Sequence, residues 1–140
     1  MSAVEARLDR LESIEDIRRI PQRYARAIDE RDIDALATLF HPNGEIVAGG
    51  RRQTVVDHLA ELRDKPRTFA KSMHVLADPL IDVDVGNDAA TMDVYAVVIQ
   101  LERVDGGADM ALGVQYRHRL GRDAGGWLIV HRTSEILWIK

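Results

Sequence analysis

The hydrophobic residues of this chain change their spacing part-way along it, and that change constrains the fold more than any other feature. From Ser13 to Ile28, apolar side chains recur every three or four positions, which is the spacing of one helical face. Beyond Lys71, apolar and polar residues alternate, as in strands with one buried face. Helices followed by a meander of long strands predict an α+β fold, with three N-terminal helices packed on a strongly curved antiparallel sheet.

Capping and breaking residues suggest where each helix begins and ends. Ser13 is expected to cap the first helix, and Pro21 to kink it, because proline lacks a backbone N–H and clashes with the preceding turn. Asp32 can cap a second helix, and a turn at His41–Gly44 precedes a third helix at Thr54–Arg63. Strands are expected at 45–48, at 73–85 with a bend at Asp78-Pro79, and at 91–103, 110–120 and 127–139.

Composition limits the partners and the compartment. We expect residues 1–140 to form a single domain, because this length suits one hydrophobic core. The net charge of -4 offers no basic surface for nucleic acid. No apolar run is long enough to span a membrane and the charged N-terminus does not resemble a signal peptide, so a cytoplasmic protein is expected. The absence of cysteine excludes disulfides and thiolate catalysis.

Asp29 and His74 form the first candidate pair for chemistry. Asp29 falls at the C-terminal end of the first predicted helix, where its charge meets the negative end of the helix dipole, so a stabilising role is not expected there. His74 alternates with Met73 and Val75 and points to the opposite sheet face. In a shared cavity, the carboxylate would orient the ring while the free ring nitrogen abstracts a proton. The alternatives are a solvated aspartate and a satisfied core histidine.

Tyr24 and Arg132 are two further candidates. Tyr24 lies in the apolar stripe of the first helix, where its hydroxyl could donate to a substrate or simply find a backbone partner in the core. Arg132, on the last strand, could clamp an anionic or electronegative group or form an ordinary cross-strand salt bridge. No metal and no cofactor are expected, because neither the remaining histidines nor the aspartates have the spacing of a metal motif.

Four segments share a pattern with known proteins: Ile14–Arg19, Tyr24–Asp29, Asp32–Phe40, and Gly126–Arg132 with Trp138 after it. In these segments, and over almost its whole length, the chain resembles the SnoaL-like, or nuclear-transport-factor-2-like, superfamily. The resemblance implies a cone-shaped domain in which three helices cover a curved sheet. It also implies a homodimer or homotrimer.

Within this superfamily, the pattern is most similar to the subgroup of scytalone dehydratase and hexachlorocyclohexane dehydrochlorinase. The histidine-aspartate dyad of that subgroup falls on His74 and Asp29, and the last-strand arginine of the dehydrochlorinase falls on Arg132. Tyr24 replaces a dehydrochlorinase lysine, and the second dehydratase histidine has no counterpart in Thr91–Arg103. Neither activity is therefore expected to be present unchanged.

The resemblance and the residues together predict a cofactor-independent lyase or isomerase of the dehydratase type, acting on a small apolar or aromatic substrate. His74 would remove a proton, Asp29 would orient His74, and Tyr24 and Arg132 would polarise the substrate or assist the leaving group. Two alternatives stay open. One is a non-catalytic ligand-binding or assembly module resembling the β subunits of ring-hydroxylating dioxygenases, and the other is a polyketide cyclase.

Overall fold

The computed structural model describes residues 1–140 and contains three α-helices, all from the first half of the chain. Helix α1 (Ala3–Glu30) is 28 residues long, whereas α2 (Ile33–Ala37) and α3 (Val55–Asp64) are short. One turn of 3-10 helix, η1 (Val85–Asn87), interrupts the strands. No helix combines the length and the apolar composition that a membrane span requires.

The strands form one open, curved sheet in the order β2-β1-β7-β6-β5-β3, and β4 also pairs with β5. Neighbouring strands are antiparallel, except that β1 and β7 run parallel. The predicted α+β fold is confirmed. The strand bounds are β1 (Phe40–Ala48), β2 (Arg51–Thr54), β3 (Phe69–Leu76), β4 (Leu80–Asp84), β5 (Ala89–Arg103), β6 (Met110–Asp123) and β7 (Gly126–Ile139).

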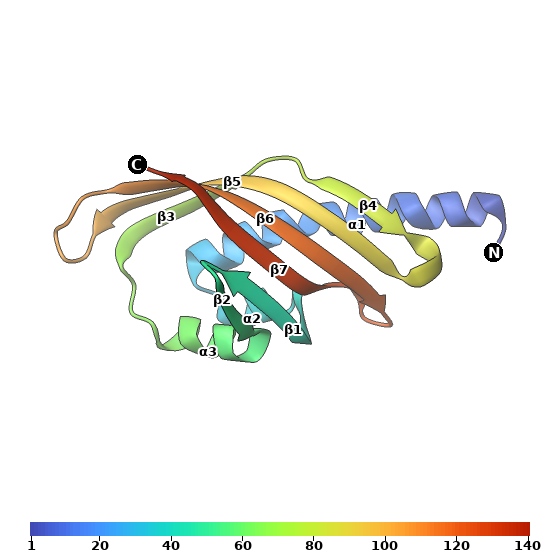
Figure 1. Ribbon diagram of the computed structural model, residues 1–140, viewed down its shortest axis with the longest axis horizontal. Helices are drawn as coiled ribbons and strands as arrows, with labels where there is room; N and C mark the ends of the chain where they lie inside the picture. Colours follow the sequence, from blue (N-terminus) through green and yellow to red (C-terminus); the bar gives the residue numbers. More distant parts are fainter.

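One hydrophobic core joins the helices to the concave side of the sheet. Figure 1 shows the long strands β5, β6 and β7 twisting across the molecule, with α1 along one face and its N-terminal turns projecting beyond the sheet. Five different elements each place at least one almost fully buried apolar side chain in this core: Ile17, Leu36, Ile46, Met92 and Ile129. Because the interior is built from residues far apart in sequence, it forms only when the sheet closes over the helices.

Two positions of helix α1, Ser13 and Pro21, were expected to shape it. The predicted N-cap at Ser13 is wrong: Ser2 caps the helix by accepting a hydrogen bond from the Glu5 N–H at 3.1 Å. Ser13 is buried inside the helix, where its hydroxyl donates to Asp9 Oδ1 at 3.2 Å. The helix does not end at Pro21 but continues through this buried residue, and the kink expected there stays a prediction. A long face packed on the sheet outweighs the roughly 3 kcal/mol that an interior proline costs.

The turn predicted at His41–Gly44 is wrong as well, because these residues lie inside β1. Strand β1 pairs with β7 on both sides of the segment, so the breaker residues produce an irregularity between Phe40 and Glu45, not a reversal of the chain. A Cβ atom at Gly44 would lie 2.9 Å from the His41 carbonyl oxygen and 3.2 Å from that of Val130. Glycine therefore permits the close approach of β1 to β7 here.

Most other predicted boundaries agree with the structure, but β3 begins at Phe69 and not at Met73, and β2 was not predicted. Asp32 caps α2 by accepting a hydrogen bond from the Ala35 N–H at 3.0 Å, and Thr54 caps α3 by accepting from the Asp57 N–H at 3.1 Å. The Asp78-Pro79 dipeptide separates β3 from β4, as expected for a bend. Strands β5, β6 and β7 match their predicted ranges to within a few residues.

Candidate functional site

Asp29 and His74 meet on the concave side of the sheet. His74 Nδ1 lies 2.6 Å from Asp29 Oδ1, and the backbone N–H of His74 donates to Asp29 Oδ2 at 2.8 Å. The Ser72 hydroxyl also donates to Asp29 Oδ1, at 3.4 Å. The carboxylate therefore binds both the ring and the backbone of the same histidine, which fixes the ring orientation. No group of the chain bonds to His74 Nε2, so this nitrogen remains available to a ligand.

The C-terminal end of α1 holds Asp29 in place. Arg31 ends the helix in the left-handed conformation, with φ 55°, and its N–H caps the carbonyls of Ala27 and Ile28. The Arg31 guanidinium donates to the Leu62 carbonyl at 3.0 Å and also to the Lys65 carbonyl, which anchors this end of α1 to the segment after α3. The unfavourable position of Asp29 in the helix dipole is offset by the hydrogen bonds from β3.

Strand β3 supplies the histidine through simple alternation. Met73 and Val75 are half-exposed on the convex side of the sheet, whereas the His74 side chain is only 10% exposed on the concave side. Tyr24, one and a half turns before Asp29 on α1, packs against the imidazole with the ring planes perpendicular and the centroids 5.8 Å apart. The helix and the strand therefore present three chemically active side chains to one space.

Arg132 lies deeper on the same side, without an ionic partner. It is 4% exposed, its Nε has no hydrogen-bond partner, and no carboxylate lies within 4.0 Å of its guanidinium. Three aromatic rings surround the guanidinium carbon, those of Tyr24 at 4.9 Å, Tyr116 at 5.2 Å and Phe40 at 5.5 Å. Cation–π attraction thus replaces a counter-ion, with each ring contributing about 0.5–2 kcal/mol.

A bulge in β7 determines which way Arg132 faces. Leu120 of β6 pairs with Ile129, but Arg119 pairs with His131, so Val130 is an extra residue. Strict alternation from the buried Ile129 would place His131 inside and Arg132 outside. The bulge reverses this order, and Arg132 is buried opposite His118.

Two histidines near Arg132 are held neutral. Burial lowers the pKa of His118 to about 3, and the positive charge of Arg132 lowers it further in the same direction. Burial, followed by the Arg132 charge, also lowers the pKa of His58 on α3 to about 4. Burial raises the pKa of the Tyr116 phenol, which therefore stays protonated. At neutral pH, Arg132 is therefore the only charged group among these four side chains.

Two cavities adjoin the Asp29–His74 pair. The larger has a volume of about 580 Å³ and is lined by Tyr24, His74, Tyr116 and Arg132 together with apolar residues of β5, β6 and β7. The smaller, of about 160 Å³, lies on the Asp29 side and is lined by Asp29, Ser72 and a rim of basic residues. His74 and Gln100 line both cavities. No group of three or more His, Asp or Glu side chains is arranged to hold a metal ion.

The SnoaL-like domain family matches residues 9–133 of the sequence. The chain belongs to this family. No curated protein matches this SnoaL-like domain significantly. The structure of this chain is similar to that of an NTF2-like protein with a cystatin-like fold from Novosphingobium aromaticivorans. The two sequences are 27% identical, the match covers 96% of this chain and 88% of that chain, and the TM-score is 0.83.

Two similar structures carry names of enzymes. One, from Novosphingobium aromaticivorans, is named as a candidate scytalone dehydratase, with 20% identity, 98% and 90% coverage and a TM-score of 0.77. The other is hexachlorocyclohexane dehydrochlorinase LinA-type3 from Novosphingobium barchaimii, with 14% identity, 99% and 93% coverage and a TM-score of 0.79. At these identities, the likeness establishes the shared fold.

All four predicted site residues of the SnoaL-like domain lie around one space. Asp29 and His74 are in hydrogen-bond contact, and Tyr24 contacts both His74 and Arg132. Their roles in catalysis stay a prediction. The sequence analysis did not single out Tyr116 or Gln100, and it gave His118 no role. Tyr116 and His118 alternate along β6 in step with the buried Val114, so they point to the same inner face, and this alternation could have identified them.

Proposed function

We propose that this SnoaL-like domain is a cofactor-independent lyase or isomerase that removes a proton from a small, largely apolar substrate. The observation that carries the proposal is the 2.6 Å contact between Asp29 Oδ1 and His74 Nδ1, beside a cavity of organic-molecule size. A pair too far apart to hydrogen-bond would have favoured a non-catalytic binding module.

His74 acts as the general base through Nε2. Its Nδ1 carries the hydrogen that is donated to Asp29, so the lone pair of Nε2 is directed away from the carboxylate and can accept a substrate proton. The imidazolium that forms is stabilised by the Asp29 charge, as in other carboxylate-histidine pairs. In an elimination, the electrons of the broken C–H bond form a new double bond and a leaving group departs with its own bonding pair. In an isomerisation, the double bond migrates and the His74 imidazolium returns the proton to another carbon.

Tyr24 and Arg132 act on the negative charge that develops during the reaction. Both line the larger cavity, and Arg132 Nε has no partner in the protein, so its donor capacity is unused. A preorganised donor in a desolvated site stabilises a developing oxyanion or leaving anion far more than a donor in water does. Tyr24 is the second donor in this proposal, because it lines the same cavity as Arg132 and carries a phenolic hydrogen.

The test is proton exchange and elimination in heavy water. A panel of small unsaturated and aromatic compounds, each with an acidic C–H and a hydroxyl or halide on the adjacent carbon, is incubated with the protein and followed by proton NMR. We expect loss of the acidic C–H signal or appearance of an alkene for at least one compound. His74→Gln should remove this conversion, whereas Arg119→Gln, an exposed residue on the opposite face of the sheet, should retain it.

Binding of a panel compound without any exchange would favour the non-catalytic module. Ring closure of a polyketone, also abolished by His74→Gln, would instead identify a polyketide cyclase that uses the same base.

A further inference from the structure

No carboxylate of the protein pairs directly with Arg132, whose guanidinium has only aromatic rings as its close charge-stabilising neighbours. The only carboxylate that lines the larger cavity is Glu135, whose side chain is 62% exposed and lies 3.8 Å from Arg117. His118 and His58 carry no charge at neutral pH, for the reasons given above. A buried cation without a counter-ion is costly in the empty protein, so its natural partner is an anion supplied from outside.

The remaining lining of the larger cavity is suited to a hydrocarbon body. Apolar side chains of the central strands, Val98, Leu112 and Val114, face this space, with Ile136 from β7. A phosphate would need several donors, whereas one planar guanidinium matches the two oxygens of a single carboxylate. A ligand with one carboxylate and an apolar body therefore fits this lining better than a polyanion does.

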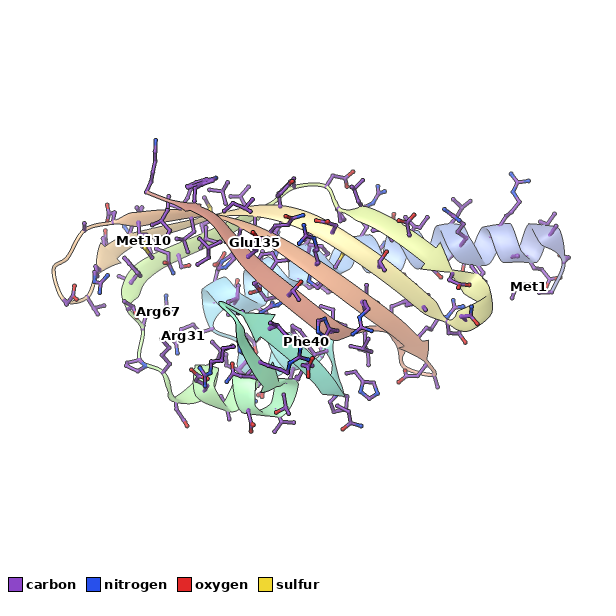
Figure 2. All side chains as sticks on the ribbon, viewed as in Figure 1. Met1, Arg31, Phe40, Arg67, Met110 and Glu135 are labelled. Carbon is purple, nitrogen blue, oxygen red and sulfur yellow. The ribbon has the colours of Figure 1, made fainter.

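Basic residues also surround the smaller cavity. Arg31, Lys65 and Arg67 line it, and none of them lies within 4.0 Å of a carboxylate. Figure 2 shows Arg31 and Arg67 at the same end of the molecule, near the segment between α3 and β3. On a chain with a net charge of -4, this grouping creates a local positive potential that attracts anions to the site.

We propose that the substrate is a small monocarboxylate, whose carboxylate pairs with Arg132 while its apolar body lies against Val98, Leu112 and Val114. This inference names the substrate class of the reaction proposed above and rests on that proposal. Tyr24 contacts both Arg132 and His74, so the anionic group and the acidic C–H of one small molecule can be bound at the same time.

The experiment compares benzoate with its neutral isostere benzamide by isothermal titration calorimetry at millimolar concentration. We expect the wild-type protein to bind benzoate at least about tenfold more tightly than benzamide, because a charge-assisted pair is the stronger contact. Arg132→Gln should lower benzoate affinity by about tenfold and change benzamide affinity little. Arg132→Lys, which keeps the charge, should retain part of the preference. Arg119→Gln, on the convex face, is the matched control and should behave as wild type.

Equal affinity for the two compounds, undetectable benzoate binding, or unchanged benzoate binding by a folded Arg132→Gln variant would each overturn the inference. The comparison of benzoate with benzamide uses only the wild-type protein, so it tests the inference even if a variant does not fold. Benzoate binding should persist in His74→Gln. If it does while no panel compound exchanges a proton, the anion site stands and the proposed reaction fails. If neutral compounds alone are converted, the reaction stands and the anion inference fails.

Discussion

The two faces of the central sheet are made by alternate residues of the same strands, yet they differ in chemistry. On the concave face, His118 and Arg132 are 8% and 4% exposed among aromatic and aliphatic side chains. On the convex face, Met73, Val75 and Tyr95 are 50–58% exposed. The polar groups that most proteins keep in water are inside this molecule, and a set of apolar groups is outside it.

From this inversion we predict a partner for each face. A buried arginine and two neutral histidines reduce stability unless a ligand uses them, which is the usual relation between stability and function at a binding site. The exposed apolar side chains of β3 and β5 form a contiguous region, together with Trp138, whose indole lies across Gly113. The concave face is suited to a small ligand and the convex face to another protein surface.

The largest effect we expect is a loss of catalytic turnover when residues of the concave face are changed. Asp29→Asn and His74→Gln should each reduce turnover by about 10²–10⁴-fold, because each removes part of the general base. The double variant should lose hardly more than either single one, since the pair acts as a unit. Initial rates on a converted compound, with thermal unfolding as the check on folding, measure this. Additive losses would show that the two residues act separately.

Acid should destabilise the protein through its concave face. The folded-state pKa of His118 is about 3 and its unfolded value is 6.5, so the unfolded chain binds more protons between these values and stability is lost as pH falls through this window. His58, with a folded-state pKa of about 4, acts with the same sign. From pH 6.5 to pH 5, His118 alone should cost about 2 kcal/mol of unfolding free energy.

Urea unfolding at the two pH values measures this loss. His118→Gln, which can still donate to the Met92 carbonyl, should flatten the pH dependence. An identical slope in the variant and the wild type would contradict this account.

The convex face should control assembly. The homodimer or homotrimer expected from the sequence stays a prediction, and we place its contact on the region of Val75, Tyr95 and Val97, which a second copy could cover with the same surface. Val75→Glu should weaken association by about tenfold or more in sedimentation equilibrium. Arg119→Glu, on the polar part of this face, should leave association unchanged. A wild-type protein that is monomeric at micromolar concentration would argue against this interface.

The smallest effect we expect is on the stability of the ligand-free protein when Arg132 is replaced. Arg132→Met replaces an uncompensated cation with an apolar side chain of similar length, and it should raise the unfolding free energy by about 1 kcal/mol. The gain is limited because the cation–π contacts with three rings are lost. Urea unfolding without ligand measures it. A clear loss of stability would show that Arg132 serves the core more than a ligand.

The periodic parts of the fold were predictable from the sequence, and the interrupted parts were not. Alternation located β3 and the inward direction of His74, and the position of Asp29 at the end of α1 followed from the helical spacing. Ser13 misled because a serine that bonds within the helix looks like a cap in sequence. His41–Gly44 misled because strand pairing with β7 overrides local turn chemistry.

The site residues also differ in how far the sequence could predict them. The pairing of Asp29 with His74 was indicated by the parity of β3, the end of α1 and the family resemblance together. The inward direction of Arg132 could not be derived from alternation, because it depends on a bulge that local pattern does not reveal; only the family resemblance indicated that position. The aromatic rings around Arg132 come from α1, β1 and β6, and no local rule relates elements so distant in sequence.

Because Val130 is an extra residue in β7, the pairing register of this strand determines which basic side chain faces the cavity. If the bulge moved beyond Arg132 toward the C-terminus, His131 would turn inward, and an imidazole would take the place of the guanidinium. Gly44 is the residue that fits against the Val130 carbonyl at the present position of the bulge. A glycine that lies outside the lining of either cavity beside His74 thus helps to decide whether the interior of this domain holds a permanent cation.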